Sequence, residues 1–440
     1  MAFRILVIAP TSFFSDYGAH VRILEEISHL QERGHSILVC TYHTGGDVPG
    51  VPIHRSIDVP WKRGVMVGSS RHKLYFDVGL AATVQRAALE FKPDLVHAHL
   101  HEGALLGWPV RMLHKVPLIF DYQGSLTAEM QDHHFLRPES PFFRPLKWLE
   151  RRIDRSADAV IVSSRNAEHR LRLSIRDYTD RITTVIDAVN TQVFAPPGSG
   201  LERNALLALK HSLGIPGERK VVAYLGLLAP YQGTDLLLEA ASIMLNEWGR
   251  HDIHFLLMGF PGVDSYRAQA DKLGLNGYVS FPGRISYSSA PRFLAVGDVA
   301  VAPKISSTEG AGKIGNYMAM ALPVVTFDTA VSREYLNDLG VYASPGDSRS
   351  LAERLRQVLD NPERYREVGT QLRERCIEDL SWRGATDSIE NIYKRAISAR
   401  LQIDPLNNRA LPEAAQVGIS SSPTMRAPVA ATPRPRSAVK

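Results

Sequence analysis

Cysteine and long apolar runs are both scarce in this sequence, and each absence narrows the class of protein. Among 440 residues only Cys40 and Cys376 are cysteines. Two thiols so far apart build neither a disulfide framework nor a CxxC metal site, so we expect free, buried thiols in a reducing compartment. No segment approaches the roughly 18 apolar residues of a membrane-spanning helix. The apolar run at residues 3–9 is short and Pro10 follows it at once, so we interpret it as a buried strand rather than a secretion signal.

A strong charge imbalance is also missing from most of the chain. The formal net charge is +5, and residues 404–440 contribute +3 of it through five basic side chains against two acidic ones. A nearly neutral body with a basic tail rich in Pro, Ser and Ala is weak evidence for nucleic-acid binding, so we expect no nucleic-acid partner and a disordered tail. We expect a cytoplasmic protein that touches the inner face of a membrane at most peripherally.

Apolar strands and amphipathic helices alternate along the chain in two series. In the first, strands are expected at residues 3–9, 35–42, 94–100, 116–124 and 158–164, with helices at 19–34, 82–93 and 144–157 between them. The second begins near Lys220 and ends with charged amphipathic helices over 345–376 and 381–401, and residues 190–217 are expected to link the two series. Strands that alternate with helices predict parallel, doubly wound sheets. The predicted fold is α/β, with two Rossmann-like domains facing each other across a cleft.

Ligands of such sheets bind beyond the carboxyl ends of the strands. After the first strand the chain reaches Gly18 and then His20 on the first turn of a predicted helix, and helix N-termini attract anions. This loop contains neither GxGxxG nor GK[ST], so it is neither a dinucleotide fingerprint nor a P-loop.

A second loop of interest joins the predicted strand at 298–304 to a helix near Ile314. Its glycines, Gly310 and Gly312, allow close backbone approach to a ligand. Glu309 offers an acceptor for sugar hydroxyls, and Lys313 places a cation where a diphosphate could lie. Glycine and serine are common in any such loop, however, and a lysine is often only a solvated surface charge.

Several segments together resemble the retaining glycosyltransferases of family four (glycosyl transferases group 1), which have the GT-B fold. They are GAHVRILEEISHLQERGH, KPDLVHAHL, ADAVIVSS, YLGLLAPYQGTDLLLEA and, above all, EGAGKIGNYMAMALPVV. The resemblance covers most of residues 1–400. It predicts an acceptor domain at 1–195, a nucleotide-sugar donor domain at 200–384, a helix at 385–402 that packs back on the N-terminal domain, and a disordered tail at 403–440.

The resemblance implies a hexosyltransferase that moves a sugar from a nucleotide-diphosphate sugar to a glycan, lipid or small-molecule acceptor, for example a cell-envelope polysaccharide. It implies retention of the anomeric configuration and no metal or other cofactor, because helix N-terminal amides and basic side chains neutralise the leaving diphosphate. Glu309 matches the first glutamate of the family signature and is the main catalytic candidate. Gly310, Ala311 and Gly312 follow it in the donor loop.

The sequence departs from the family at the diphosphate site. Members carry an Arg and a Lys where this chain has Leu227 and Gln232. Charge-assisted contacts are worth about 1.5–3 kcal/mol each, so the loss of both cations would be costly. The candidates to replace them are Lys313, Lys304 and Arg284, although each could equally be a surface or structural residue.

Two further positions differ from the family. The second glutamate of the signature matches Asn316, or its neighbour Tyr317, because the interval is one residue shorter than usual. The family's His-Gly pair after an N-terminal strand is replaced by Gln123 and Gly124, with Asp121 two residues earlier, and Gln123 and Asp121 are the catalytic candidates besides Glu309. A glutamine can orient a hydroxyl but cannot act as a proton-transfer base.

Three histidines, His97, His99 and His101, have the alternate spacing of a metal cluster, but the resemblance places no metal there. We favour a structural or acceptor-side role over zinc.

Other functions remain open from the sequence alone. The absence of both diphosphate cations, of the histidine and of the second glutamate is also compatible with a non-catalytic GT-B-like binding protein. An epimerase or a phosphorylase could use the same fold. The segments at 60–77 and 144–155 mix aromatic and basic residues, which would suit contact with an anionic membrane. Ordinary solvated helix faces explain them as well.

Overall fold

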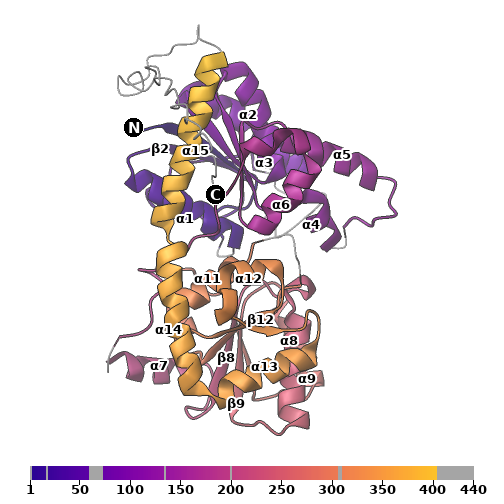
Figure 1. Ribbon diagram of the computed structural model, residues 1–440, viewed down its shortest axis with the longest axis vertical. Helices are drawn as coiled ribbons and strands as arrows, with labels where there is room; N and C mark the ends of the chain where they lie inside the picture. Colours follow the sequence, from indigo (N-terminus) through magenta and orange to yellow (C-terminus); the bar gives the residue numbers. More distant parts are fainter. Residues whose placement is uncertain are drawn as a thin grey trace, which may run out of the picture.

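Two parallel β-sheets organise the chain, one in each half, and helices cover both faces of each sheet (Figure 1). The computed structural model describes residues 2–15, 18–58, 73–132, 135–198, 201–305 and 310–403. Predicted strands and helices recur in the expected order, and the prediction of two Rossmann-like domains is confirmed. The expected tail at 403–440, apart from its first residue, lies outside the described residues.

The N-terminal sheet has seven strands in the order β3-β2-β1-β4-β5-β6-β7, all parallel. The strands are β1 (Arg4–Ala9), β2 (Ser36–Thr41), β3 (Ile53–Arg55), β4 (Leu95–His99), β5 (Leu118–Tyr122), β6 (Ala159–Val162) and β7 (Ile182–Thr184). The helices are α1 (Gly18–Glu32), α2 (Lys73–Phe91), α3 (Leu100–His114), α4 (Leu126–Asp132), α5 (Phe143–Asp154), α6 (Arg165–Ser174) and the 3₁₀ turn η1 (Arg176–Arg181). The strand order reverses between β1 and β4, which opens a crevice at their carboxyl ends.

The C-terminal sheet has six parallel strands in the order β10-β9-β8-β11-β12-β13. They are β8 (Lys220–Leu225), β9 (Ile253–Met258), β10 (Val279–Gly283), β11 (Val299–Ala302), β12 (Val324–Phe327) and β13 (Val341–Ala343). The helices are α7 (Leu201–Ser212), η2 (Pro230–Gln232), α8 (Thr234–Ser242), the π-turn η3 (Ile243–Glu247), α9 (Val263–Lys272), α10 (Ala290–Leu294), α11 (Gly312–Ala319), α12 (Ala330–Leu336), η4 (Asn337–Leu339), α13 (Ser348–Asp360), α14 (Pro362–Asp379) and α15 (Trp382–Ile403). The equivalent reversal lies between β8 and β11.

Part of the segment expected to be a linker is helical. Helix α7 falls inside residues 190–217, and it forms because Leu206 and Leu209 pack on the core of the C-terminal half. The apolar spacing that predicts such a helix is present in the sequence, but the neighbouring Pro and Gly residues masked it.

The chain passes between the two halves at two points that are tied together. The first is near Val189 and the second near Leu380, and the amide of Val189 donates to the carbonyl of Leu380 at 2.8 Å. After the second crossing, α15 runs back along the N-terminal half and packs against α1 (Figure 1).

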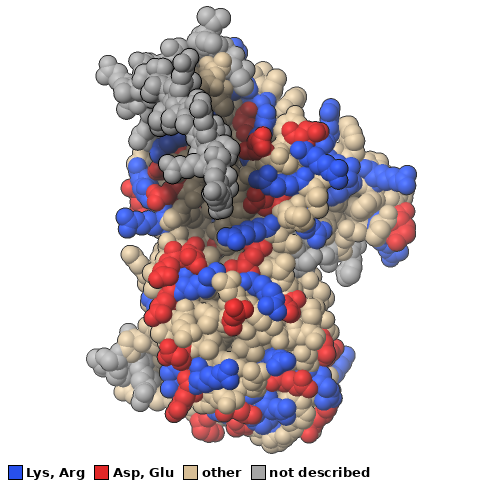
Figure 2. Space-filling view, viewed as in Figure 1, with Lys and Arg blue, Asp and Glu red and all other residues tan. Residues whose placement is uncertain are grey.

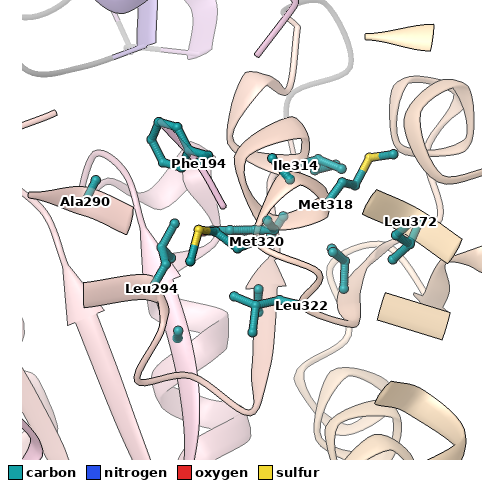
Figure 3. Close-up of a cluster of buried hydrophobic side chains, with 14 of the residues drawn as sticks. Phe194, Ala290, Leu294, Ile314, Met318, Met320, Leu322 and Leu372 are labelled. Atoms are coloured by element: carbon teal, nitrogen blue, oxygen red, sulfur yellow. The ribbon is translucent and has the colours of Figure 1, made fainter. Parts of the chain in front are cut away.

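Helix α11 is anchored from below by an apolar cluster. Ile314 and Met318 point into this cluster, together with Leu372 from α14 and Phe194 from the connecting segment (Figure 3). Burial of a side chain of this size stabilises the fold by about 1.5–3 kcal/mol. The first turn of α11 is therefore held in a fixed place at the carboxyl end of β11.

Both cysteines are free and buried, as the sequence predicts, and burial raises the pKa of each thiol to about 12. Within the part of the chain that the structure describes, none of the helices has the length and apolar character needed to cross a bilayer.

Candidate functional site

A cavity of about 320 Å³ lies between the two halves and is lined by both. We call it the cleft. From the N-terminal half it is lined by residues that include Gly18, Arg22, Gln123 and Asp187, and from the C-terminal half by residues that include Leu227, Gln232, Lys304, Gly310, Ala311, Gly312, Lys313 and Asn316. Most of the predicted site residues thus meet at the carboxyl edges of the two sheets.

Lys313, on the first turn of α11, lies beside the loop after β8 from which the family cations are missing. Its Nζ donates to Oε1 of Gln232 at 2.8 Å and contacts the Tyr224 hydroxyl at 3.2 Å, with the Tyr224 ring centroid 4.4 Å away. It also lies so close to Gly226 that a Cβ at that position would be 2.6 Å from Nζ. Its amine therefore lies directly beside Gln232, one of the two positions at which the sequence lacks a cation.

The other two candidate cations lie differently. Lys304 lines the cleft, and its Nζ donates to the carbonyl of Gly310 at 2.9 Å. Arg284 is exposed, with its guanidinium 5.2 Å from the ring centroid of Phe260, and it is not among the described residues that line the cleft. Of the three, Lys313 and Lys304 are placed to meet a ligand in the cleft.

Asn316 and Tyr317, the two alternatives for the second glutamate, point in different directions. Asn316 lines the cleft. Tyr317 is fully buried, and its hydroxyl bridges the backbone of Leu225, accepting from the amide at 2.8 Å and donating to the carbonyl at 3.2 Å. Tyr317 therefore holds the end of β8 against α11, and Asn316 is the residue of the pair that can contact a ligand.

The start of α1 contributes backbone atoms, and no charged side chain from its first turn, to the wall of the cleft. Gly18 lines the cleft, while His20 is fully buried and its Nδ1 accepts from the amide of Ser15 at 2.8 Å. Burial, with smaller contributions from Arg284 and Lys73, lowers the pKa of His20 to about 3. The imidazole is therefore neutral at physiological pH and supplies no cation for a phosphate.

Arg22 forms the centre of a buried charge network that sequence reasoning missed. It binds both oxygens of Asp121 at 3.1 Å and also donates to Asp187. Asp121 further contacts Nδ1 of His99 at 2.9 Å and the amide of Gln123 at 3.1 Å. Burial by itself would raise the pKa of Asp121, but Arg22 and His99 outweigh it and hold the pKa well below its usual range.

These contacts separate the roles available to Asp121 and Gln123. Asp121 is completely enclosed, so its carboxylate fixes Arg22 and does not itself line the cleft. Gln123 lines the cleft while one end of its amide is held by Asp121, which leaves it able to orient a substrate hydroxyl.

The three alternating histidines each pair with an acid. Nδ1 of His97 lies 2.8 Å from Glu26, and Nε2 of His101 lies 3.1 Å from Asp154. Glu26, His97, His99 and Asp121 are close enough to share a metal ion. However, both carboxylate oxygens of Asp121 already accept hydrogen bonds from the guanidinium of Arg22. The arrangement therefore suits a network of hydrogen-bonded charges better than a metal site.

Glu309, the main catalytic candidate, lies outside the described residues. Two residues that sequence reasoning missed, Arg22 and Asp187, follow the same rule that located the others. Asp187 comes just after β7, at the carboxyl end of a parallel strand, and Arg22 lies near the start of the helix after β1.

A further signal was overlooked in the donor loop itself. Residues 310–315 read GAGKIG, a GxGxxG pattern that begins in the loop after β11 and continues into the first turn of α11. This strand–loop–helix context is the one in which such glycines cradle phosphates and pack a helix closely. Gly315 accordingly lies against Val189, where an added Cβ would be 3.7 Å from the valine side chain.

Both halves of the chain match glycosyltransferase family models, and the chain is similar to known proteins over most of its length. The family described as "Glycosyl transferase 4-like domain" matches residues 17–185, and "Glycosyl transferases group 1" matches residues 208–375. A D-inositol 3-phosphate glycosyltransferase from Corynebacterium glutamicum is 22% identical over 404 residues, which cover 87% of this chain and 92% of that protein. Its counterpart from Mycobacterium avium is 27% identical over 406 residues, covering 86% and 89%.

Solved structures share the fold at lower identity. A sucrose-phosphate synthase from Thermosynechococcus elongatus has a TM-score of 0.75 at 18% identity, covering 90% of this chain and 99% of that one. Anabaena Alr3699/HepE, in complex with UDP and glucose, has a TM-score of 0.70 at 16% identity, covering 88% and 98%.

Proposed function

The chain is a divergent glycosyltransferase of the GT-B fold, and from that premise we propose that it takes its sugar from a nucleotide-diphosphate donor bound in the C-terminal half. The acceptor, a glycan, lipid or small molecule, would bind against the N-terminal wall. We further propose that the anomeric configuration is retained and that no metal ion takes part, with Glu309 and Gln123 at the reacting centre.

The position of Lys313 carries this proposal. A leaving diphosphate needs positive partners, and those that the family supplies are absent at Leu227 and Gln232. The ammonium of Lys313 lies 2.8 Å from the Gln232 side chain, at the first turn of α11, where backbone amides also face an anion. The glycine pattern at 310–315 lets the diphosphate approach this turn closely.

Two features support a nucleotide sugar rather than another anion. The cleft is large enough for a small-molecule ligand, and Asn316 lines it within α11, where its amide could hold a sugar or ribose hydroxyl. A structural neighbour, Alr3699/HepE, has been solved with UDP and glucose and with UDP-glucose. We propose the same class of donor for this chain.

Calorimetric titration with UDP-, GDP- and ADP-sugars tests the donor site. We expect one of them to bind the wild-type protein, and Lys313→Met to weaken that binding by about 10- to 100-fold, the equivalent of one charge-assisted contact. Lys313→Arg should keep most of the affinity. Lys272→Met, which removes an exposed lysine at the end of α9, is the matched control and should bind like wild type. Failure of the wild-type protein to bind any nucleotide sugar would overturn the proposal.

Product analysis separates transfer from the other activities that the fold can host. Release of nucleoside diphosphate together with a glycosylated acceptor supports the enzyme. Tight binding without any product would indicate a non-catalytic binding protein, and sugar phosphate formed only with added inorganic phosphate would indicate a phosphorylase. NMR of the new linkage decides whether the configuration is retained.

We also propose that helix α5 brings the protein to an anionic membrane. Trp148 on this helix is 62% exposed, and Phe142, directly before the helix, is 69% exposed. Arg144, Arg151 and Arg152 lie on the same short helix, and Figure 2 shows Lys and Arg side chains gathered on this projecting part of the N-terminal half. Apolar and basic groups side by side are what an anionic bilayer surface binds.

Co-sedimentation with vesicles checks the membrane contact. Binding to phosphatidylglycerol vesicles, little binding to phosphatidylcholine vesicles, and loss of binding in Trp148→Ser would support it. The other segment with this composition, residues 60–77, falls largely outside the described residues. Equal binding of wild type and Trp148→Ser would count against α5.

A further inference from the structure

One carboxylate of the N-terminal half reaches the donor loop of the C-terminal half. Asp187 follows β7 and lines the cleft, and its side chain is 17% exposed. Its Oδ1 accepts from Arg22, while its Oδ2 faces Gly310, where an added Cβ would lie only 2.5 Å away. A Cβ added at Gly312, the first residue of α11, would lie 3.5 Å from the same oxygen. Asp187 therefore lies against the turn at which we place the donor diphosphate.

The orientation of Asp187 is set by a chain of fixed groups. Arg22 holds one of its oxygens, and Arg22 is itself gripped by both oxygens of the fully buried Asp121. Asp121 is held in turn by His99 and Gln123. Such support around a side chain is what keeps a reacting group in one geometry.

The charges in this group do not cancel. Arg22 supplies a single positive charge that Asp121 and Asp187 share, so the three side chains carry a net negative charge when both carboxylates are ionised. Burial raises the pKa of Asp187 more than Arg22 lowers it. Charged side chains that are buried at such a cost on the wall of a cleft most often belong to a binding or catalytic site.

Building on the transfer proposed above, we propose that Asp187 is a catalytic residue whose carboxylate contacts the transferred sugar and stabilises the positive charge that develops at its anomeric carbon. In this step the bond between the anomeric carbon and the diphosphate oxygen breaks, and its electron pair leaves with the nucleoside diphosphate. The acceptor oxygen forms the new bond to the same carbon, and its proton passes to the leaving diphosphate. Asp187 forms no bond and takes no proton; it supplies a fixed negative charge where the transition state needs one.

The substitution Asp187→Asn tests this role because it keeps the size of the side chain and removes its charge. We expect kcat to fall by about 100- to 1000-fold, the usual effect of losing one preorganised charge in a reacting centre. The Kd for the nucleoside diphosphate, measured by calorimetry, should stay within about threefold of wild type, since that ligand lacks the sugar. Asp158→Asn is the control: Asp158 is another partly buried aspartate that pairs with an arginine, at 2.7 and 2.8 Å, but it is not among the described residues that line the cleft. The turnover of this variant should resemble wild type.

A second variant reaches the same carboxylate from the other side. Gly310→Ala places a methyl carbon only 2.5 Å from Oδ2 of Asp187 and forces the carboxylate to shift without removing its charge. We expect a fall in kcat of about tenfold or more, because small displacements of a catalytic group are costly. This variant decides the question if Asp187→Asn does not fold.

The outcomes are distinct. Wild-type turnover in Asp187→Asn, or in Gly310→Ala if the first variant is unfolded, would overturn the role of Asp187 and leave the donor proposal intact. Parallel losses of kcat and of nucleotide affinity would also overturn it, because they indicate a structural contact between the halves. A wild-type protein that binds no nucleotide sugar would overturn both proposals.

Discussion

Replacing Arg22 with methionine should destabilise the N-terminal half by about 3–5 kcal/mol, the cost of removing one partner from a buried ion pair. Asp121 has no exposed surface, and both of its oxygens accept from Arg22 at 3.1 Å. The methionine fills much of the same space, so little of the loss comes from a cavity. What remains is a buried carboxylate whose contacts with His99 and Gln123 do not replace a guanidinium.

The size of this effect should depend on pH in a defined direction. In the wild-type protein the pKa of Asp121 lies well below its usual range, so the pair stabilises the fold fully above the unfolded pKa of about 3.9 and the stabilisation is lost as the pH falls through the native value. In the variant, burial acts without Arg22 and the pKa of Asp121 rises, so protonation relieves the unpaired charge. The difference between the two proteins should therefore be largest near neutral pH and shrink toward acid.

Urea unfolding followed by circular dichroism, at several pH values, measures the difference. Hydrogen exchange of β5 peptides assigns the transition to the N-terminal half. Arg333→Met is the control, because Arg333 also binds an aspartate, Asp328, through two hydrogen bonds but is 51% exposed. Its loss should change stability little, because solvent screens an ion pair this exposed. A loss in Arg22→Met no larger than in the control, or one that does not change with pH, would refute the reasoning.

Three other changes have expected outcomes. Gly233→Ala should lower the thermal unfolding temperature by several degrees, because Gly233 has φ +75° and an added Cβ would lie 1.8 Å from the carbonyl oxygen of Pro303; an unchanged melting curve would contradict this. Tyr317→Phe should cost about 1–3 kcal/mol in urea unfolding, since the amide of Leu225 loses its partner, and a neutral result would show that water replaces the hydroxyl. His20→Gln should make the protein less sensitive to acid between pH 6.5 and about 3: the folded pKa is lowered to about 3, so the unfolded state binds the proton first and wild-type stability falls across that window. Equal acid sensitivity in both proteins would rule out this contribution.

The arrangement of the two halves could be predicted because it depends on patterns that are local in sequence. Continuous apolar runs such as those of β1 and β9 alternate with amphipathic helices, and this periodicity determines parallel sheets with ligand sites at their carboxyl ends. The same reasoning located the loop before α11 and the strand end at Gln123. Helix α7 was missed because its short apolar pattern follows a segment rich in Pro and Gly.

The charge relations within the site could not be predicted, because they join residues far apart in sequence. Nothing in the sequence indicates that Arg22 meets Asp121, 99 residues later. The sequence names Lys313 as one of three candidate cations, but it does not show that Lys313 is the one that meets Gln232. Nor does composition reveal that His20 is buried so deeply that it stays neutral. Spacing selects candidate residues, whereas only the packing of the sheets decides which of them share a charge.

The tie between Val189 and Leu380 has a mechanical consequence for the cleft. Both connections between the halves pass through one hydrogen-bonded point, so the halves cannot separate there without breaking that bond. Val189 and Trp382, which belong to these connections, also line the cleft. A ligand in the cleft therefore lies against the joint between the halves, and any closure of the walls around it would have to be taken up by backbone dihedrals of these two connections.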